Sequence, residues 1–279
     1  MKWAFLLCVA AAGAITAAAE LPPGLILRFT CDEFRENGKM LPDVTGSNNN
    51  GRVSGAKPTP AGRLSGGCEF TGKNSSVRVP HSPVFNSPQA TFCLWFKTMA
   101  SGTTDRTLLE KGSGNGYALR IAGAAQTDPR KGKLRATVDG HDCFSDAAVA
   151  DNAWHHAAVT YDGVLLKLYV DGTLQKQTGA GWGDLGGNTQ DLTLGLNRPD
   201  PNPKRREKEA GFEGVLDEVM LFNRALAEPE LKTVMAETRP KFTKWQVERR
   251  LKELKELLDR GLILQDFYER KVKECEVTP

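Results

Sequence analysis

The sequence predicts an all-β fold, a sandwich of two antiparallel sheets, followed by a small C-terminal pair of helices. Residues 154–172 read as two strands joined by Asp162-Gly163 and closed by a second Asp-Gly turn, Asp171-Gly172. Asp-Gly suits tight hairpins because a type I′ turn needs positive φ at both central residues. Further short strand-like runs recur with Gly, Pro and Asp between them, which is typical of a sandwich. Helices that alternate with strands, as a parallel sheet requires, are not predicted before residue 226.

Alternation of apolar and polar residues marks the strands of this predicted sandwich. In the hairpin, Leu166, Leu168 and Val170 share one face, which is the period of two that a sheet with one buried face requires. The other strand signals lie at residues 25–31, 67–70, 76–79, 91–98, 117–121, 133–138, 143–149, 191–194 and 214–222.

The apolar spacing becomes helical after Pro240. Four apolar residues recur at spacings of four, three and four, and Gly261 then offers a left-handed helix stop before a second, shorter helix. An αα-hairpin of this size is marginal alone, so we expect its seam to pack on a partner, on a second copy, or on the chain's own sandwich. The seam residues are Val247, Leu251, Leu254 and Leu258.

Four segments are expected along the chain: an export signal, the sandwich, a linker and the helical hairpin. Residues 1–19 are typical of a secretory signal peptide, with a positive start at Lys2, an apolar run and a small-residue cleavage site. Residues 20–236 form the predicted sandwich, 237–246 a linker and 247–279 the helical hairpin. We therefore expect an exported protein, periplasmic, cell-surface or extracellular, without a transmembrane span. The net charge of +3 is too small to imply a nucleic-acid partner.

Five cysteines follow the predicted signal peptide. Export makes disulfides chemically available, but an odd number leaves at least one thiol unpaired, and spacing cannot assign partners. The alternative is that each is a small buried hydrophobe, because each lies in an apolar or strand-like context. They are Cys31, Cys68, Cys93, Cys143 and Cys275.

Six motifs together resemble the laminin-G-like jellyroll family, of the concanavalin A-like lectin/glucanase type. In order and spacing they cover roughly residues 25–236. The resemblance implies a two-sheet antiparallel jellyroll whose rim loops bind glycans or proteins, often near a calcium ion. Over a shorter stretch, residues 249–276 resemble the C-terminal module called SHOCT. The jellyroll motifs are GCEFTG at 67–72, VRVP at 77–80, TFCLWFK at 91–97, GYALR at 116–120, and the stretches 154–172 and 211–226.

A structural calcium ion is one cofactor that the resemblance implies. Asp217 is predicted on an apolar strand face with Val219 and Leu221, where a carboxylate is costly unless it is paired, hydrogen-bonded or metal-bound. The family's early loop is matched by Asp43, Gly46 and Asn48, in a polar loop that includes the run SNNNG at 47–51, and it could supply further oxygens to a hard cation. Alternatively, Asp217 caps backbone amides or pairs with an arginine, and Asp43 initiates a turn. Pentraxins, which the sandwich also resembles, have a cysteine opposite Cys93, but that position falls near His156 or Ala157 here, so the bridge is missing and Cys143 is the substitute partner.

The predicted ligand-binding residues lie on the rim loops 112–116, 179–187 and 197–208. The last of these is basic, and arginine forks match the carboxylate and sulfate groups of anionic glycans; the alternative is a solvated insertion. Trp182 either stacks on a sugar or closes the end of the sandwich. The basic-loop candidates are Arg198, Lys204, Arg205 and Arg206.

The sequence carries no recognisable catalytic motif. Jellyroll glucanases carry acids in the pattern Glu-x-Asp-x-x-Glu, whereas Asp217 and Glu218 are adjacent and therefore diverge. His155 and His156 point to opposite faces of a strand, so they cannot chelate one ion together. We expect an exported, non-catalytic module that binds a glycan or an extracellular or envelope protein. The alternatives are an assembly protein that oligomerises through its helices, and a glycan-active enzyme.

Overall fold

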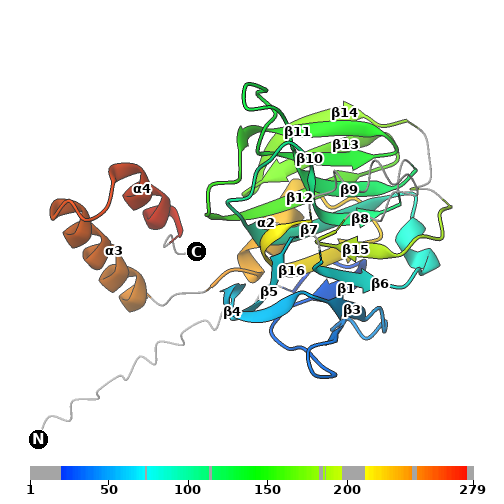
Figure 1. Ribbon diagram of the computed structural model, residues 1–279, viewed down its shortest axis with the longest axis horizontal. Coiled ribbons are helices and arrows are strands. Elements are labelled where there is room, and N and C mark those ends of the chain that lie inside the picture. The colour runs from blue at the N-terminus through cyan, green and yellow to red at the C-terminus, as the bar shows by residue number, and fades with distance from the viewer. Residues whose placement is uncertain are drawn as a thin grey trace, which may run out of the picture.

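A computed structural model of the chain shows two antiparallel sheets stacked as a sandwich, with helices at the C-terminal end (Figure 1). This confirms the predicted fold class. The structure describes residues 20–72, 74–112, 115–181, 185, 187–196, 211–240 and 244–274, so the predicted signal peptide lies outside the described residues.

Sheet A contains most of the strands whose motifs are visible in the sequence. It includes the predicted hairpin and the long strand that precedes the C-terminal helices. A further strand, β1 (Leu25–Phe29), pairs with that long strand off the main path. The order of the others is β14 (Thr173–Gly179), β13 (Leu165–Val170), β12 (Trp154–Tyr161), β7 (Ala90–Lys97), β16 (Glu213–Phe222), β5 (Gly66–Thr71) and β4 (Lys57–Leu64).

Sheet B is also eight-stranded, and its neighbouring strands are all antiparallel. A 3-10 turn, η1 (Pro83–Asn86), follows one of its strands. The order is β11 (His141–Ala148), β10 (Lys133–Val138), β9 (Tyr117–Ile121), β8 (Arg106–Lys111), β15 (Leu192–Leu194), β6 (Ser76–Val79), β3 (Gly51–Ser54) and β2 (Met40–Leu41).

Two hairpin turns show how the Asp-Gly dipeptides work. Asp171 and Gly172, between β13 and β14, both have positive φ, as a type I′ turn needs. Between β12 and β13 only Gly163 has positive φ. There the Asp162 carboxylate accepts the N–H groups of Val164 and Leu165 instead. The first turn is therefore an Asx-type loop and only the second is the predicted type.

β7 is buried on both faces, which explains why its residues 92–96 are all apolar. Phe92, Leu94 and Phe96 face the interior between the sheets. Cys93 and Trp95 face outward into a second apolar layer beneath α2 (Glu228–Glu237). That layer also holds Tyr169, Met220, Phe222, Leu226, Leu231 and Val234.

The two faces of β12 separate the adjacent histidines, as the sequence predicts. His155 is opposite Phe96 in the register and its ring lies near that side chain, whereas His156 contacts the Trp95 ring edge-on. Burial lowers the pKa of His156 to about 4, so this histidine is neutral at physiological pH. Both histidines pack as parts of the sheet.

A β-bulge in β16 corrects one prediction about side-chain direction. The register shifts between Asp217 and Met220, and Glu218 has a φ of 48°. Val219 and Leu221 face the interior, but the inserted residue breaks the alternation, and Asp217 is opposite the outward-facing Trp95. The prediction that Asp217 shares the face of Val219 and Leu221 is therefore wrong.

The four described cysteines are free, buried thiols: Cys31, Cys68, Cys93 and Cys143. The suggested bridge between Cys93 and Cys143 is not formed, because Cys93 lies in the layer beneath α2 and Cys143 in the core between the sheets. Cys275 lies outside the described residues.

The C-terminal helices α3 (Lys244–Asp259) and α4 (Gln265–Glu274) form a hairpin drawn to one side of the sandwich in Figure 1. Gly261, with a φ of 67°, ends α3, and its N–H donates to the Leu258 carbonyl. Val247 and Leu254 are buried in a cluster made only of hairpin residues, which also holds Leu251, Ile263, Phe267 and Tyr268. None of the described helices is long and apolar enough to cross a membrane.

Candidate functional site

The sequence-predicted site residues divide into two groups. Asp43 and Asp217 lie in the described structure. The ligand-binding candidates Trp182, Arg198, Lys204, Arg205 and Arg206 lie outside the described residues.

Asp217 is a buried hydrogen-bond acceptor for the backbone. Its Oδ2 accepts the N–H groups of Arg63 and Leu64 at 2.7 and 2.9 Å, and its Oδ1 accepts the N–H of Glu218 at 2.7 Å. Burial raises the pKa of Asp217 to about 7, although the hydrogen bonds from the backbone oppose that shift. The structure thus shows the alternative interpretation, in which Asp217 caps amides.

Glu218 is held by an arginine from the neighbouring strand. Arg28 of β1 donates from its Nε to Oε2 at 3.0 Å and from its Nη2 to Oε1 at 3.2 Å. Burial raises the pKa of Glu218, and the Arg28 charge opposes the rise. Because of the bulge, the adjacent carboxylates of Asp217 and Glu218 have different partners: Asp217 accepts backbone N–H groups, and Glu218 pairs with Arg28.

Asp43 organises the loop between β2 and β3. Its Oδ1 accepts the N–H groups of Arg28 and Thr45, both at 3.1 Å, and its Oδ2 accepts the N–H of Asn49 at 3.2 Å. The Thr45 hydroxyl donates to the same carboxylate at 2.8 Å. These bonds make Asp43 the initiator of a turn.

The two aspartates do not fit a calcium site. A hard cation needs six to eight free oxygens, but backbone and hydroxyl donors already engage the carboxylates of Asp43 and Asp217. No group of three or more His, Cys, Asp or Glu side chains suited to a metal gathers anywhere in the described part of the chain. The binding of a structural calcium ion itself stays a prediction.

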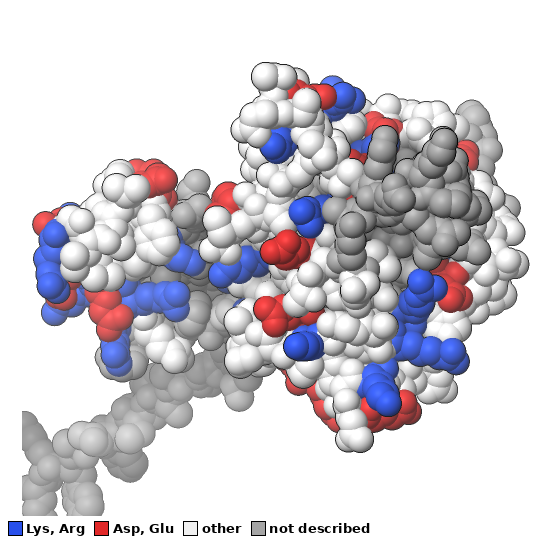
Figure 2. Space-filling model, in the orientation of Figure 1, with Lys and Arg blue, Asp and Glu red and all other residues white. Residues whose placement is uncertain are grey.

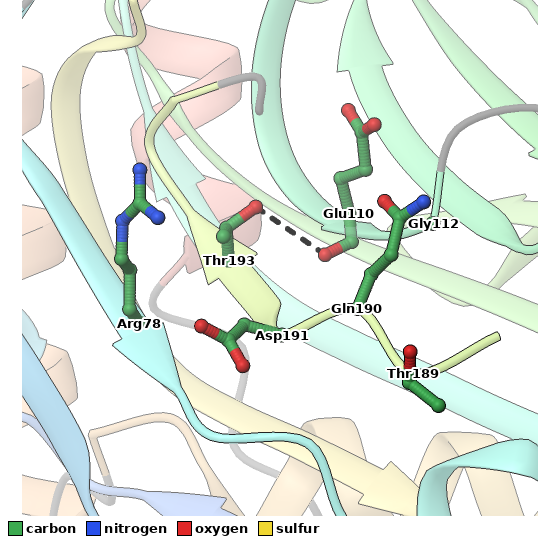
Figure 3. A pocket seen from close by; sticks show the side chains of 7 residues that line it. All are labelled: Arg78, Glu110, Gly112, Thr189, Gln190, Asp191 and Thr193. Atoms are coloured by element: carbon green, nitrogen blue, oxygen red, sulfur yellow. Dashed lines mark hydrogen bonds between the residues drawn. The ribbon is translucent and has the colours of Figure 1, made fainter. Parts of the chain in front are cut away.

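A hollow of about 160 Å³ lies on the outer face of sheet B, the face turned away from the interior (Figure 3). Leu192 and Leu194 of β15 point into the core, so Thr193 between them points outward. In the register Thr193 is opposite Arg78 of β6 on one side and Glu110 of β8 on the other. Cross-strand partners share a face, which brings these three side chains together. Gly112, Thr189, Gln190 and Asp191 complete the lining.

Ion pairs fix the side chains beyond this hollow. Arg120 of β9 donates to Glu110 at 2.8 Å, and the two side chains are only 16% and 5% exposed. Further along the same face, Arg135 lies between Asp105 at 2.7 Å and Asp142 at 2.8 Å. The acids and arginines of β8 to β11 therefore neutralise one another.

A buried lysine positions the loop that completes the hollow. Lys111, at the end of β8, is fully buried, and its Nζ donates to the Gln190 carbonyl at 2.7 Å and to the Asn188 Oδ1 at 3.0 Å. Burial lowers the pKa of Lys111 to about 8. Asn188 in turn donates to the Asn115 carbonyl at 3.2 Å. These contacts hold Gln190 at the hollow, where its buried Oε1 has no hydrogen-bond donor.

A second, larger hollow of about 490 Å³ adjoins the first on the side of β3. Arg52 lines the second hollow and is directly opposite Arg78, which lines the first. His81, also in the second, donates its N–H to the Asp191 Oδ1 at 3.0 Å. We call the two together the β6 hollows. The second is lined by Glu36, Lys39, Met40, Asn48, Asn49, Asn50, Arg52, Pro80, His81 and Ser82.

Sequence reasoning missed most of this site. Of the three predicted rim loops, 112–116 contributes Gly112, and the polar run at 47–51 contributes three asparagines. The alternation in Val77-Arg78-Val79 does indicate that Arg78 points outward. That pattern cannot show that Arg52 and Thr193 become its neighbours, because strand order is set by the folded chain.

Comparison with known proteins adds a family and several similar structures. Residues 71–232, more than half of the chain, match a Laminin_G_3 family model described as the concanavalin A-like lectin/glucanases superfamily. No curated protein sequence matches the chain.

Three similar solved structures share the sandwich. Domain 4 of AbnA, a GH43 extracellular arabinanase from Geobacillus stearothermophilus, was solved with arabinotriose; it is 19% identical, with a TM-score of 0.57 over 75% of this chain and 97% of that one. The binding domain of botulinum neurotoxin DC, in complex with rat synaptotagmin II, is 15% identical, with a TM-score of 0.57 over 77% and 52%. Botulinum neurotoxin type C, whose cell entry depends on interaction with two ganglioside molecules, is 17% identical, with a TM-score of 0.56 over 78% and 52%. The chain thus spans about half of the neurotoxin structures, and these identities show the fold alone.

Proposed function

The chain belongs to the concanavalin A-like lectin/glucanases superfamily, and from this premise we propose that its sandwich is a non-catalytic module that binds glycans at the β6 hollows. One observation carries the proposal. Amide, hydroxyl, carboxylate and guanidinium groups from adjacent strands line these hollows, and such groups are the partners that sugar hydroxyls need. The similar domain 4 of the arabinanase, solved with arabinotriose, supports the same ligand class.

A binding role is favoured over hydrolysis by the state of the acids. Glycoside cleavage needs two carboxyl groups free to act across the scissile bond. Glu110 is already paired with Arg120 at 2.8 Å, and Asp191 accepts the His81 N–H. Asp217 and Glu218, the adjacent acids noted in the sequence, are engaged by backbone amides and by Arg28.

The C-terminal hairpin is proposed to connect the module to its site of action. It resembles SHOCT modules, and its apolar cluster is closed by its own residues, so the seam is covered by α4. This supports a tethering role more than self-association. Together with the predicted signal peptide, it suggests an exported module acting on extracellular or envelope glycans.

The test is a binding screen with matched variants of the mature protein, residues 20–279. Neutral and acidic oligosaccharides would be titrated calorimetrically, and released reducing ends measured in parallel. Gln190→Ala and Thr193→Ala should weaken binding at least tenfold. Thr173→Ala, an exposed threonine at the start of β14, should leave it unchanged.

Two results would contradict the proposal. Glycan binding that none of these variants alters would place the site elsewhere on the chain. If the protein releases reducing ends, and this activity is lost in Gln190→Ala and Thr193→Ala but kept in Thr173→Ala, the hollow is a catalytic site and the protein is an enzyme.

A further inference from the structure

We propose that the β6 hollows select an acidic sugar, and that Arg52 and Arg78 together bind its anionic group, a carboxylate or sulfate. This inference rests on the proposed glycan-binding function and deepens it. The residues involved differ from those of the basic loop at 197–208, which lies outside the described structure.

The arrangement of Arg52 and Arg78 is the first observation. They are directly opposite each other on the antiparallel strands β3 and β6. Side chains in this relation have Cβ atoms about 4.5–5.5 Å apart, and like charges placed so are destabilising. An anion between two guanidinium groups converts that repulsion into paired attraction, and the planar forks match both oxyanions.

The absence of protein partners for these two arginines is the second observation. On the same face Arg120 is paired with Glu110, and Arg135 with Asp105 and Asp142. Within the described chain, neither Arg52 nor Arg78 has an acid within salt-bridge distance, although Arg78 is half-buried. The face therefore neutralises its arginines everywhere except at this pair.

The surrounding charge also favours an anion. Lys39 adds a third cation, while Glu36 and Asp191 are the acids of the hollows that lack an arginine partner in the described chain. Figure 2 shows Lys and Arg side chains gathered at this end of the face, over β3 and β6, with acidic side chains at the margin. Cations thus outnumber the unpaired acids.

The ligand must also carry hydroxyl groups. Gln190 lines the hollow across Thr193 and Asp191 from Arg78, as Figure 3 shows, and its buried Oε1 lacks a donor. Sulfate has no hydrogen to donate to this acceptor, whereas a sugar hydroxyl can donate to it once the half-buried Gln190 side chain turns into the hollow. Asp191 has a second carboxylate oxygen that can accept another hydroxyl. An acidic sugar satisfies both the guanidinium pair and these acceptors.

The lining gives no aromatic platform for a neutral sugar. Among the described residues that line the two hollows, none is Phe, Tyr or Trp. Stacking on an aromatic ring is the usual means of binding an uncharged sugar face. Recognition here must come from ionic and hydrogen-bonding contacts, so the anionic group of the ligand contributes a large part of the binding free energy.

The experiment compares one ligand with and without its charge. Trigalacturonate, its neutral methyl ester and a sulfated monosaccharide would be titrated into the mature protein at low and high salt. We expect Arg78→Gln and Arg52→Gln each to weaken trigalacturonate binding at least tenfold and to leave the methyl ester unchanged. Arg130→Gln removes the same charge from a remote exposed pair with Asp128 and should have no effect.

A ligand-free measurement separates binding from folding. Because Arg52 and Arg78 repel one another in the empty protein, Arg52→Gln should raise the melting temperature or leave it unchanged, whereas an arginine with a purely structural role would lower it on removal. A raised or unchanged melting temperature with lost binding therefore supports the anion site.

The failures of the two proposals are distinguishable. Equal binding of trigalacturonate and its methyl ester, both lost in Gln190→Ala, would overturn the anionic selection and leave the glycan site standing. Binding of no sugar in either form would overturn both. Binding of the sulfated sugar but not the uronate would support the arginine pair and assign sulfate as its anion.

Discussion

Replacing Asp217 by alanine tests how the β16 bulge is held. The carboxylate accepts three backbone N–H groups, from Arg63, Leu64 and Glu218, at 2.7–2.9 Å. Leaving a buried donor without a partner costs roughly 1–3 kcal/mol. The Glu218 N–H is buried and carries the full penalty, whereas water can reach the half-buried residues 63 and 64.

We expect Asp217→Ala to lower the free energy of unfolding by about 3 kcal/mol, because the relieved burial of a carboxylate offsets part of the three lost bonds. In a domain of this size that corresponds to a melting temperature lower by roughly 6–12 °C. The assay is thermal melting followed by circular dichroism, with and without EDTA. The shift should be the same in both buffers, because hydrogen bonds occupy the oxygens that calcium would need.

Asp162→Ala is the matched control. Asp162 also accepts two backbone N–H groups, from Val164 and Leu165 at 2.9 and 2.8 Å, but in an exposed turn. Removing this carboxylate should lower the free energy of unfolding by about 1 kcal/mol or less, since water replaces it as the acceptor of the two N–H groups. Equal shifts for the two variants would refute the argument from burial. A shift for Asp217→Ala that appears only with calcium present would refute the amide-capping role.

Three further predictions concern pH, the hairpin and α2. The pKa of Asp217 is raised to about 7, so the folded state keeps a proton that the unfolded state releases near pH 4. The stability contributed by this bound proton is lost as the pH rises between these two values. The free energy of unfolding of the wild type relative to Asp217→Asn should therefore fall from pH 5 to pH 8. An unchanged difference would contradict the raised pKa. Deleting residues 240–279 should alter neither the melting temperature of the sandwich nor the number of chains per particle that light scattering reports, because the hairpin cluster is self-contained. A particle that loses half of its chains on deletion would restore oligomerisation through the helices. Leu231→Ala, buried between α2 and sheet A, should destabilise the protein by about 2–5 kcal/mol in denaturant melts, and a change below 1 kcal/mol would show that α2 is not part of the core.

The strands that the sequence missed share a physical reason. β4 reads KPTPAGRL and lies at the edge of sheet A, where proline is tolerated because one side of the strand needs no hydrogen-bond donors. β14 reads TLQKQTG and is the other edge, mostly exposed and polar. β8 reads RTLLEK and is largely buried, so it lacks alternation. Alternation of apolar and polar residues indicates a strand only where exactly one face is wet, and the doubly buried β7 was recognisable by its apolar run instead.

The candidate site was less accessible to sequence reasoning than the fold. Alternation showed that Arg78 points away from the core, and composition marked the asparagine run and the loop at Gly112 as surface. The bulge at Glu218 left no such pattern, so the expected direction of Asp217 was wrong. A single inserted residue reverses every following side chain, and its position depends on pairing with β5 and β7.

Sequence patterns alone predict the class of fold, the Asp171-Gly172 turn, the helical hairpin and its end at Gly261. Each depends on interactions between residues close in the chain, through φ preferences and the period of buried side chains. The folded chain is needed to show that Arg52, Arg78 and Thr193 meet on one face, and that Lys111 holds Gln190 at the same hollow. These neighbours are 26 to 141 positions apart or joined through a loop, and hydrogen bonding between strands, rather than any local preference, sets which strands lie side by side.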